Sequence, residues 1–295
     1  MNGVLVINKP KEFTSFDVVA VVRKLTGERK AGHTGTLDPN ATGVLPVLLG
    51  SATKAQDIIP VQDKSYEADF LFGKATDTLD IWGEVTEEHE SRITKDELVS
   101  ALRRFEGAIE QLPPMYSAVS VGGKRLYEYA RRGIKVERKP REVTVYSLDL
   151  LDFDEAAQRG RISVSCSKGT YIRTLIADIA KSLHTVGCMT ALVRTSACGY
   201  TLADSITLEE LKAQSEAGEI VVRTVESLFA CYPVLTVSDK QAHRFRNGNP
   251  LDLIRLKDVE ITDKKIYRVH NRNEEFLSLG ITDLEQGVLK LYKYF

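Results

Sequence analysis

A chain of 295 residues can bury a large core and divide into one large and one small domain. No apolar run approaches the roughly 20 residues of a membrane helix, and no secretory signal precedes the first strand-like residues. We therefore expect a cytoplasmic protein that does not contact a membrane. The formal net charge is −1, from 40 basic and 41 acidic side chains, so binding of nucleic acid would require a local concentration of positive charge.

The first predicted helix begins at Ser15, which is expected to cap it, and runs to Leu25. Apolar residues recur on one face of this segment. Gly27 follows as the expected stop. The sequence therefore predicts a well-defined helix shortly before the segment from Gly32 to Pro39.

The segment from Gly32 to Pro39 sets one carboxylate, that of Asp38, in a turn that contains two glycines. Glycine permits backbone angles that other residues resist, and Pro39 fixes the chain just after the acidic residue. Such a defined backbone around a presented Asp suggests catalysis. For an isolated Asp-Pro, however, hydrogen bonding to nearby amides is the more common role.

Strand and helix patterns continue along the chain. The segment from Tyr66 to Phe72 predicts a strand with its aromatic residues on one face. A capping box at residues 94–97 predicts a helix, and strands are predicted at 143–151 and 162–166. Apolar residues then recur at helical spacing up to residue 183. Tyr171 and Arg173 are therefore expected at a strand-to-helix junction.

One segment concentrates positive charge. Residues 124–141 carry eight basic and two acidic residues, a local charge of +6. A charged run is more often a solvated surface, but Tyr127 and Tyr129 lie within this one, and interleaved aromatic rings suit contact with RNA sugars and bases. We expect this segment to contact RNA. Its basic residues are Lys124, Arg125, Arg131, Arg132, Lys135, Arg138, Lys139 and Arg141.

The pattern changes after residue 230. Capping boxes at residues 207–210 and 238–241 predict two further helices, and several short strand candidates follow the second. We predict one domain over residues 1–230 and a small β-rich domain over residues 231–295, a size that folds alone only marginally.

Several blocks of this sequence resemble the TruB family of tRNA pseudouridine synthases, in the family's order and at compatible spacing. The resemblance covers roughly residues 3–230, and the C-terminal domain is similar, more weakly, to PUA-like RNA-binding domains. It implies an α/β (α+β) pseudouridine synthase fold, with a mixed, largely antiparallel central sheet flanked by helices. The blocks are the loop around Asp38 and residues 8–10, 64–66, 76–78, 113–118, 123–131 and 167–175.

The resemblance implies conversion of uridine 55 in the tRNA T arm to pseudouridine. This reaction detaches uracil from C1′ of its ribose, rotates the base and rejoins it through C5, so it needs no cofactor and no metal. Asp38 matches the catalytic aspartate, which serves as a nucleophile or stabilises charge at the sugar or base. Addition of Asp38 and a glycal route both remain open.

Further roles follow from the same resemblance. Arg173 is expected to pair with Asp38 and keep it ionised where desolvation would raise its pKa. Tyr66 is expected to stack on the uracil, and its hydroxyl to take the C5 proton directly or through water. Taken alone, a tyrosine on an alternating strand more often packs in a core.

Other residues match family positions that contact the substrate. Tyr171 lies close to the family's site, and Leu192 packs against the base, although Val193 stands where a basic residue is expected. His33 resembles the residue that fills the space left by the flipped uridine. Asp77 resembles an acidic contact to the flipped-out nucleotides. Lys124, Arg125, Arg131 and Arg132 are expected to bind the RNA.

These expectations describe a monomer that acts on the T arm of tRNA without a protein partner. Two alternatives remain: a synthase directed by a guide RNA, as in the H/ACA type, and a tRNA-folding chaperone without catalysis. The set formed by Asp38, Tyr66 and Arg173 favours catalysis.

Overall fold

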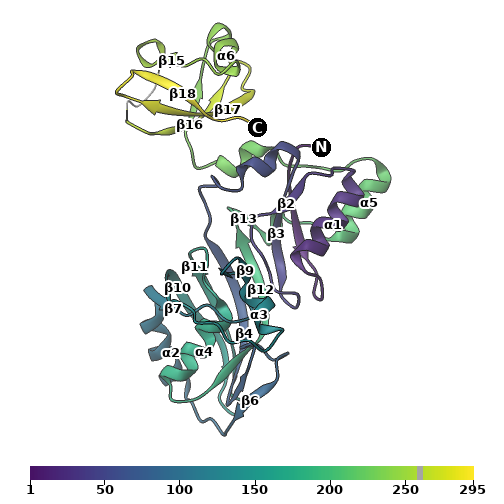
Figure 1. The fold of residues 1–295 in the computed structure, drawn as a ribbon, viewed down its shortest axis with the longest axis vertical. Helices are drawn as coiled ribbons and strands as arrows, with labels where there is room; N and C mark the ends of the chain where they lie inside the picture. Colours follow the sequence, from purple (N-terminus) through teal and green to yellow (C-terminus); the bar gives the residue numbers. More distant parts are fainter. Residues whose placement is uncertain (258–261) are drawn as a thin grey trace.

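A nine-stranded sheet runs through the larger part of the molecule (Figure 1). The structure is a computed structural model that describes residues 1–257 and 262–295. In this sheet β3 and β12 pair in parallel, and the other pairs are antiparallel, which confirms the predicted mixed, largely antiparallel sheet. The strands, in spatial order, are β1 (Gly3–Lys9), β3 (Thr42–Leu49), β12 (Gly187–Ala197), β4 (Lys64–Phe72), β11 (Arg159–Cys166), β10 (Arg141–Asp154) and β7 (Gly107–Gln111), with β2 (Ala31–His33) beside β3 and β13 (Tyr200–Thr201) beside β12.

Helices cover the two halves of the sheet as separate pairs (Figure 1). Helices α1 (Ser15–Thr26) and α5 (Leu208–Ala217) pack beside β1 and β2. Helices α2 (Lys95–Leu102) and α4 (Ile172–Ser182) pack over β10, β12 and β4. Each pair closes its own apolar core, so the sheet holds two lobes together.

The start of α1 differs from the prediction. Its cap is Thr14, whose Oγ1 accepts a hydrogen bond from the Asp17 amide at 3.1 Å, while the Asp17 carboxylate accepts one from the Thr14 amide at 2.8 Å. Ser15 is buried instead. Its hydroxyl accepts from the Leu37 amide at 2.9 Å and donates to the Leu37 carbonyl at 3.3 Å. The first turn of α1 is thereby joined to the residue before Asp38.

Other local predictions are confirmed. Tyr66 and Phe70 lie on the buried face of β4. Gly27 ends α1 with a φ of 68°. Thr94 and Thr207 cap α2 and α5.

Short elements connect these parts. Two of them form hairpins, β5 (Lys74–Thr76) with β6 (Val85–Glu88), and β8 (Ser120–Val121) with β9 (Lys124–Arg125). The second hairpin leads into α3 (Leu126–Ala130), so the basic segment begins in a small insertion between β7 and β10. The 3-10 helices are η1 (Gly50–Ala55), η2 (Arg103–Phe105), η3 (Leu202–Asp204), η4 (Val225–Phe229) and η5 (Leu253–Arg255).

A second sheet forms a β-rich C-terminal domain, seen at the top of Figure 1. Helix α6 (Asp239–Arg246) packs against it. Its strands, in spatial order, are β14 (Val234–Thr236), β16 (Ile266–His270), β17 (Phe276–Asp283), β18 (Val288–Lys293) and β15 (Leu251–Asp252).

Apolar and ionic contacts fix this domain to the large one. Phe229 of η4 packs against the rings of Tyr232 and Phe295, at centroid distances of 6.2 and 5.4 Å. Beside them, Glu226 Oε1 accepts a hydrogen bond from Arg268 Nη1 at 2.9 Å and lies 2.7 Å from His270 Nε2. The two domains therefore share a packed junction.

Gly43 offers a test of how closely β3 and β12 approach each other. Its φ is 104°, and a Cβ there would lie 2.2 Å from the Arg194 carbonyl oxygen. We predict that Gly43→Ala lowers the free energy of unfolding by about 3 kcal/mol or more, because it adds a backbone clash to a strained φ. Chemical unfolding followed by circular dichroism measures the loss.

Gly248→Ala is the matched control. Gly248 also has a positive φ, 77°, but no atom lies within 4 Å of the position its Cβ would take. Its expected loss of about 1 kcal/mol reflects backbone strain alone. Equal losses in the two variants would contradict the proposed clash.

Candidate active site

A cavity of about 280 Å³ opens where the loop before β3, strands β4 and β12 and the start of α4 meet. It collects five residues that the sequence analysis singled out from distant parts of the chain. The lining residues are Gly35, Thr36, Leu37, Asp38, Lys64, Tyr66, Tyr116, Ser117, Ala118, Gly169, Thr170, Tyr171, Ile172, Arg173 and Leu192.

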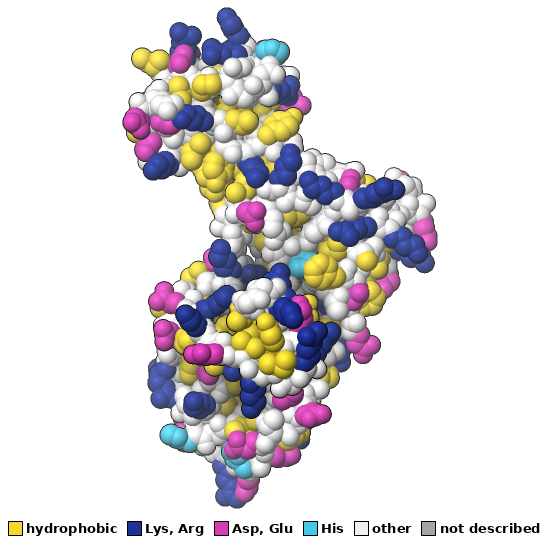
Figure 2. Space-filling view, viewed as in Figure 1, with side chains coloured by type: hydrophobic (Ala, Val, Ile, Leu, Met, Phe, Trp, Pro, Cys, Tyr) yellow, Lys and Arg dark blue, Asp and Glu magenta, His cyan; other side chains and the backbone are white. Residues whose placement is uncertain are grey.

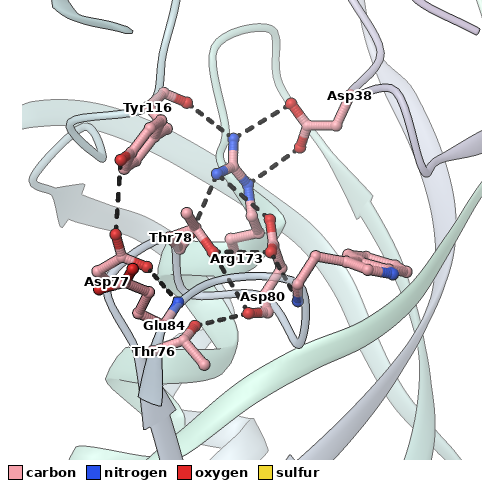
Figure 3. Close-up of polar contacts among 9 residues, drawn as sticks. Asp38, Thr76, Asp77, Thr78, Asp80, Glu84, Tyr116 and Arg173 are labelled. Atoms are coloured by element: carbon pink, nitrogen blue, oxygen red, sulfur yellow. Dashed lines mark hydrogen bonds and ion pairs between the residues drawn. The ribbon is translucent and has the colours of Figure 1, made fainter. Parts of the chain in front are cut away.

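Asp38 and Arg173 form a two-point ion pair in the cavity (Figure 3). Arg173 Nη2 lies 3.2 Å from Asp38 Oδ1, and Arg173 Nε lies 3.0 Å from Asp38 Oδ2. The Arg173 side chain is 7% exposed and that of Asp38 is 37% exposed. The pair thus holds one carboxylate in a fixed orientation while leaving part of it open to a ligand.

Further hydrogen bonds of Arg173 join two more segments to this ion pair (Figure 3). Nη1 donates to the Thr78 carbonyl at 3.0 Å, and Nη2 donates to the Tyr116 carbonyl at 2.9 Å. A second carboxylate, that of Asp80, lies 3.6 Å from Nη1. The sequence analysis did not identify Asp80, although it lies only two residues after the family block at residues 76–78.

The electrostatic balance at Asp38 follows from these neighbours. Desolvation raises the pKa of the Asp38 carboxyl above its ordinary value, while Arg173 opposes this rise. The charge of Asp80 adds to the rise, and that of Lys9 opposes it. Arg173 and Lys9 therefore support an ionised Asp38 in a site that disfavours charge.

Two buried cationic side chains donate hydrogen bonds to backbone carbonyls in and beside the Asp38 loop. Lys9 Nζ donates to the Pro39 carbonyl at 2.9 Å, and Arg194 Nε donates to the Val44 carbonyl at 2.7 Å. Arg194 Nη2 also donates to the Gly35 carbonyl at 3.2 Å. Both side chains are fully buried, and desolvation lowers the pKa of Lys9 to about 8.

Sequence reasoning missed the role of both cations. Lys9 lies in the family block at residues 8–10, and Arg194 interrupts the apolar pattern of β12. A basic residue inside such a pattern is the signal that could have found Arg194.

Tyr66 lies on the cavity wall opposite Arg194 in the β4–β12 register. Its side chain is buried, and desolvation raises the pKa of its hydroxyl to about 12, while Arg194 opposes the rise. The group is therefore a neutral phenol near neutral pH. The hydroxyl can accept a proton only if it donates its existing proton to another group at the same time.

Tyr171 and Leu192 complete the wall. The buried Gln111 side chain holds the Tyr171 peptide from both sides, since its Oε1 accepts from the Tyr171 amide at 3.0 Å and its Nε2 donates to the Tyr171 carbonyl at 3.3 Å. Sequence reasoning did not identify Gln111.

Comparison with known proteins places this cavity in context. Residues 23–172 match the TruB family pseudouridylate synthase (N terminal domain). The chain is 43% identical to tRNA pseudouridine synthase B of Clostridium perfringens over 97% of both chains. It is 48% identical to tRNA pseudouridine synthase B of Symbiobacterium thermophilum over 84% of this chain and 82% of the relative. The chain belongs to the TruB family of pseudouridylate synthases. It is therefore a pseudouridine synthase.

Solved structures support the same fold at lower identity. The TruB-family chain aligns, with a TM-score of 0.75 and 23% identity, with a chain in "Structure of H/ACA RNP bound to a substrate RNA containing 2'-deoxyuridine". It aligns with a chain in "Crystal Structure of a Cbf5-Nop10-Gar1 Complex" with a TM-score of 0.74 and 24% identity. Each alignment covers 99% of this chain and 84% of the other.

The other predicted contacts of this TruB-family chain lie outside the cavity lining. His33 is partly buried at the end of β2, with its ring edge-on to that of Phe16, and desolvation lowers its pKa. Asp77 is exposed, and its Oδ1 accepts from the Glu84 amide at 2.9 Å. Its Oδ2 accepts from the Tyr116 hydroxyl at 3.5 Å.

The basic segment lies in the insertion that also carries Tyr116 to the cavity. Lys124, Arg125, Arg131 and Arg132 are exposed. Arg131 lies over the ring of Tyr127, 5.5 Å from its centroid. Figure 2 shows Lys and Arg side chains gathered along the hollow between the lobe of α1 and the lobe of α2 and α4.

Within residues 1–257 and 262–295, no group of three or more His, Cys, Asp or Glu side chains is arranged to hold a metal ion. The same part of the chain has no helix long and apolar enough to cross a membrane.

The two-point pair predicts a pH effect. Arg173→Lys keeps a positive charge but loses the fork that holds both Asp38 oxygens, so the pKa of Asp38 should rise further. A carboxylate with a higher pKa is protonated sooner as the solution is acidified. We expect the acid limb of the rate profile to move to higher pH, and the rate at neutral pH to fall at least about tenfold. Single-turnover rates measured from acidic to neutral pH test this.

Arg161→Lys provides the control, because Arg161 makes a similar fork to Asp69 on an exposed face, at 2.5 and 3.1 Å. It should leave the profile unchanged. An acid limb that stays in place in Arg173→Lys would contradict the link between Arg173 and Asp38 ionisation.

Proposed function

We propose that this enzyme converts uridine 55 in the T arm of tRNA to pseudouridine, acting alone and without a cofactor. The observation that carries the proposal is the Asp38–Arg173 pair, set at 3.0 and 3.2 Å in a cavity walled by Tyr66 and Leu192. The relatives named tRNA pseudouridine synthase B, which match nearly the whole chain, support tRNA as the substrate.

In the proposed reaction the C1′–N1 bond breaks and a C1′–C5 bond forms. The proton at C5 leaves and N1 gains one, so no electrons are lost or gained overall. Asp38 is the nucleophile: its carboxylate forms a transient bond to the nucleoside, and this bond breaks again before pseudouridine leaves, so that Asp38 is regenerated. Arg173 orients this carboxylate and stabilises its charge during the reaction.

Walls of the cavity suit a flat base that must detach, turn and reattach. The ring of Tyr66 offers a stacking surface, and Leu192 offers an apolar contact. The Tyr66 hydroxyl, held neutral by its raised pKa, accepts the C5 proton while it releases its own toward water or N1. Tyr171 closes the site beside the detached base.

The uridine has to leave its RNA stack to reach this cavity. We propose that His33 enters the space it vacates and that Asp77 contacts the flipped-out nucleotides. The exposed basic side chains of residues 124–141 bind phosphates nearby. Residues 1–230 form the catalytic domain, and residues 231–295 form a PUA-like domain that contacts another part of the tRNA.

Asp38→Asn tests the proposed nucleophile. The substitution keeps the size of the side chain and removes its charge, so tRNA binding should stay within a few fold while pseudouridine formation is lost. The measurement is tritium release by the purified protein alone from unmodified tRNA labelled at uridine C5. Turnover above a few per cent of the parent rate would exclude the nucleophile role.

The same assay separates the alternatives. Release by the parent protein without guide RNA supports the stand-alone enzyme. No release, with tRNA binding intact, would favour a guide-dependent enzyme or a chaperone. Mapping the pseudouridine position in the product tests the choice of uridine 55.

Arg131, Arg132 and Lys135 test the docking role of the basic segment. Replacing all three with Gln should weaken tRNA binding and flatten a plot of log affinity against log salt, because fewer counterions are released on binding. A matched triple, Lys95, Arg103 and Arg104 changed to Gln at exposed positions in and beside α2, should leave both unchanged. Parental affinity and salt slope in the first triple would disprove the docking role.

A further inference from the structure

The first turn of α1 carries an exposed aromatic ring that the reaction described above does not use. Phe16 is 75% exposed. Its ring meets that of His33 edge-on, with centroids 5.2 Å apart and planes at 81°. Because this contact involves one side of the ring and most of the side chain is exposed, the ring has surface left for another flat group.

Phe16 is anchored next to the catalytic loop. The residue before it, Ser15, forms two hydrogen bonds with the backbone of Leu37, at 2.9 and 3.3 Å, and Leu37 directly precedes Asp38. Consecutive Cα atoms are only about 3.8 Å apart. Phe16 and Asp38 therefore directly follow Ser15 and Leu37, the two residues joined by this pair of hydrogen bonds. Helix α1 fixes the position of the exposed ring.

The chemistry around the ring points to a base and away from a phosphate. The neighbouring Asp17 carboxylate accepts hydrogen bonds from the Thr14 amide and hydroxyl, at 2.8 and 2.6 Å. This leaves a negative charge beside Phe16, which disfavours a phosphate group. A neutral, flat and exposed ring next to a partly buried histidine suits stacking with an unpaired nucleobase.

We propose that Phe16 is a stacking platform for an unpaired base adjacent to the uridine that enters the Asp38 cavity. This inference rests on the proposed function, in which the uridine leaves its stack and His33 fills the gap. Phe16 then extends the surface of His33, so that the RNA next to the vacated position is held by two rings. Its contribution is to binding and to placement of the RNA.

The test measures how the parent and three Phe16 variants bind a T-arm stem-loop RNA. Phe16→Tyr keeps the ring, Phe16→Leu keeps an apolar side chain without a ring, and Phe16→Ala removes both. Binding is followed by the fluorescence of Trp82, the only tryptophan in the chain, whose amide donates to Asp80 Oδ1 beside the cavity. Since Phe16 is exposed, all variants should fold, and circular dichroism checks this.

The expected result is that Phe16→Ala and Phe16→Leu bind about 5- to 100-fold more weakly, while Phe16→Tyr stays within about twofold of the parent. The salt slope of all three should equal that of the parent, because no phosphate contact is lost. Val221→Ala, at another exposed apolar position (72%), should bind as the parent does.

Stem-loops with one base removed at each unpaired position identify the partner base. At one position, removal of the base should weaken RNA binding by the parent as much as Phe16→Ala does. In the Phe16→Ala variant, removal of the same base should weaken RNA binding no further. Parental binding by Phe16→Ala, retained binding by Phe16→Leu, or a changed salt slope would overturn the platform.

Tritium release from the parent is measured on the same RNA. Its failure would overturn the proposed function, whereas release together with parental binding by Phe16→Ala overturns only this inference.

Discussion

The two-point contact between Arg173 and Asp38 lies where several segments of the large domain meet. A guanidinium has a fixed planar fork, so it can orient a carboxylate only where the surrounding chain places both groups accurately. Here Arg173 also binds the carbonyls of Thr78 and Tyr116. Four segments far apart in the sequence thus meet at one side chain, and the arrangement of β4, β12 and α4 places them there.

Local patterns predicted much of this scaffold. Alternation along β4 predicted the buried face that carries Tyr66, and capping boxes predicted the starts of α2, α5 and α6. The prediction was wrong at Ser15, because Thr14 and Ser15 are both good capping residues and local sequence does not separate them. The choice depends on Leu37, whose backbone binds the Ser15 hydroxyl.

Less of the site than of the scaffold could be predicted from the sequence. The meeting of Asp38 and Arg173 across 135 positions was expected from the family resemblance and not from periodicity. The contacts of Lys9, Arg194 and Gln111 were missed because their partners are backbone groups, which every residue carries, so the sequence does not show which groups these side chains bind. The exposure of Phe16 likewise depends on how α1 packs.

Lys9 and Arg194 have a consequence for the balance between stability and rate. Both side chains are buried and donate to backbone carbonyls in and beside the Asp38 loop. Burying each cation has a desolvation cost, which these hydrogen bonds offset, together with the charge of Asp38 in the case of Lys9. That cost is incurred once, when the chain folds, and the loop dipoles are then already oriented when a substrate arrives. Such preorganisation lowers the reorganisation energy of each turnover. The orientation of the loop is therefore set when the chain folds and not by the ligand.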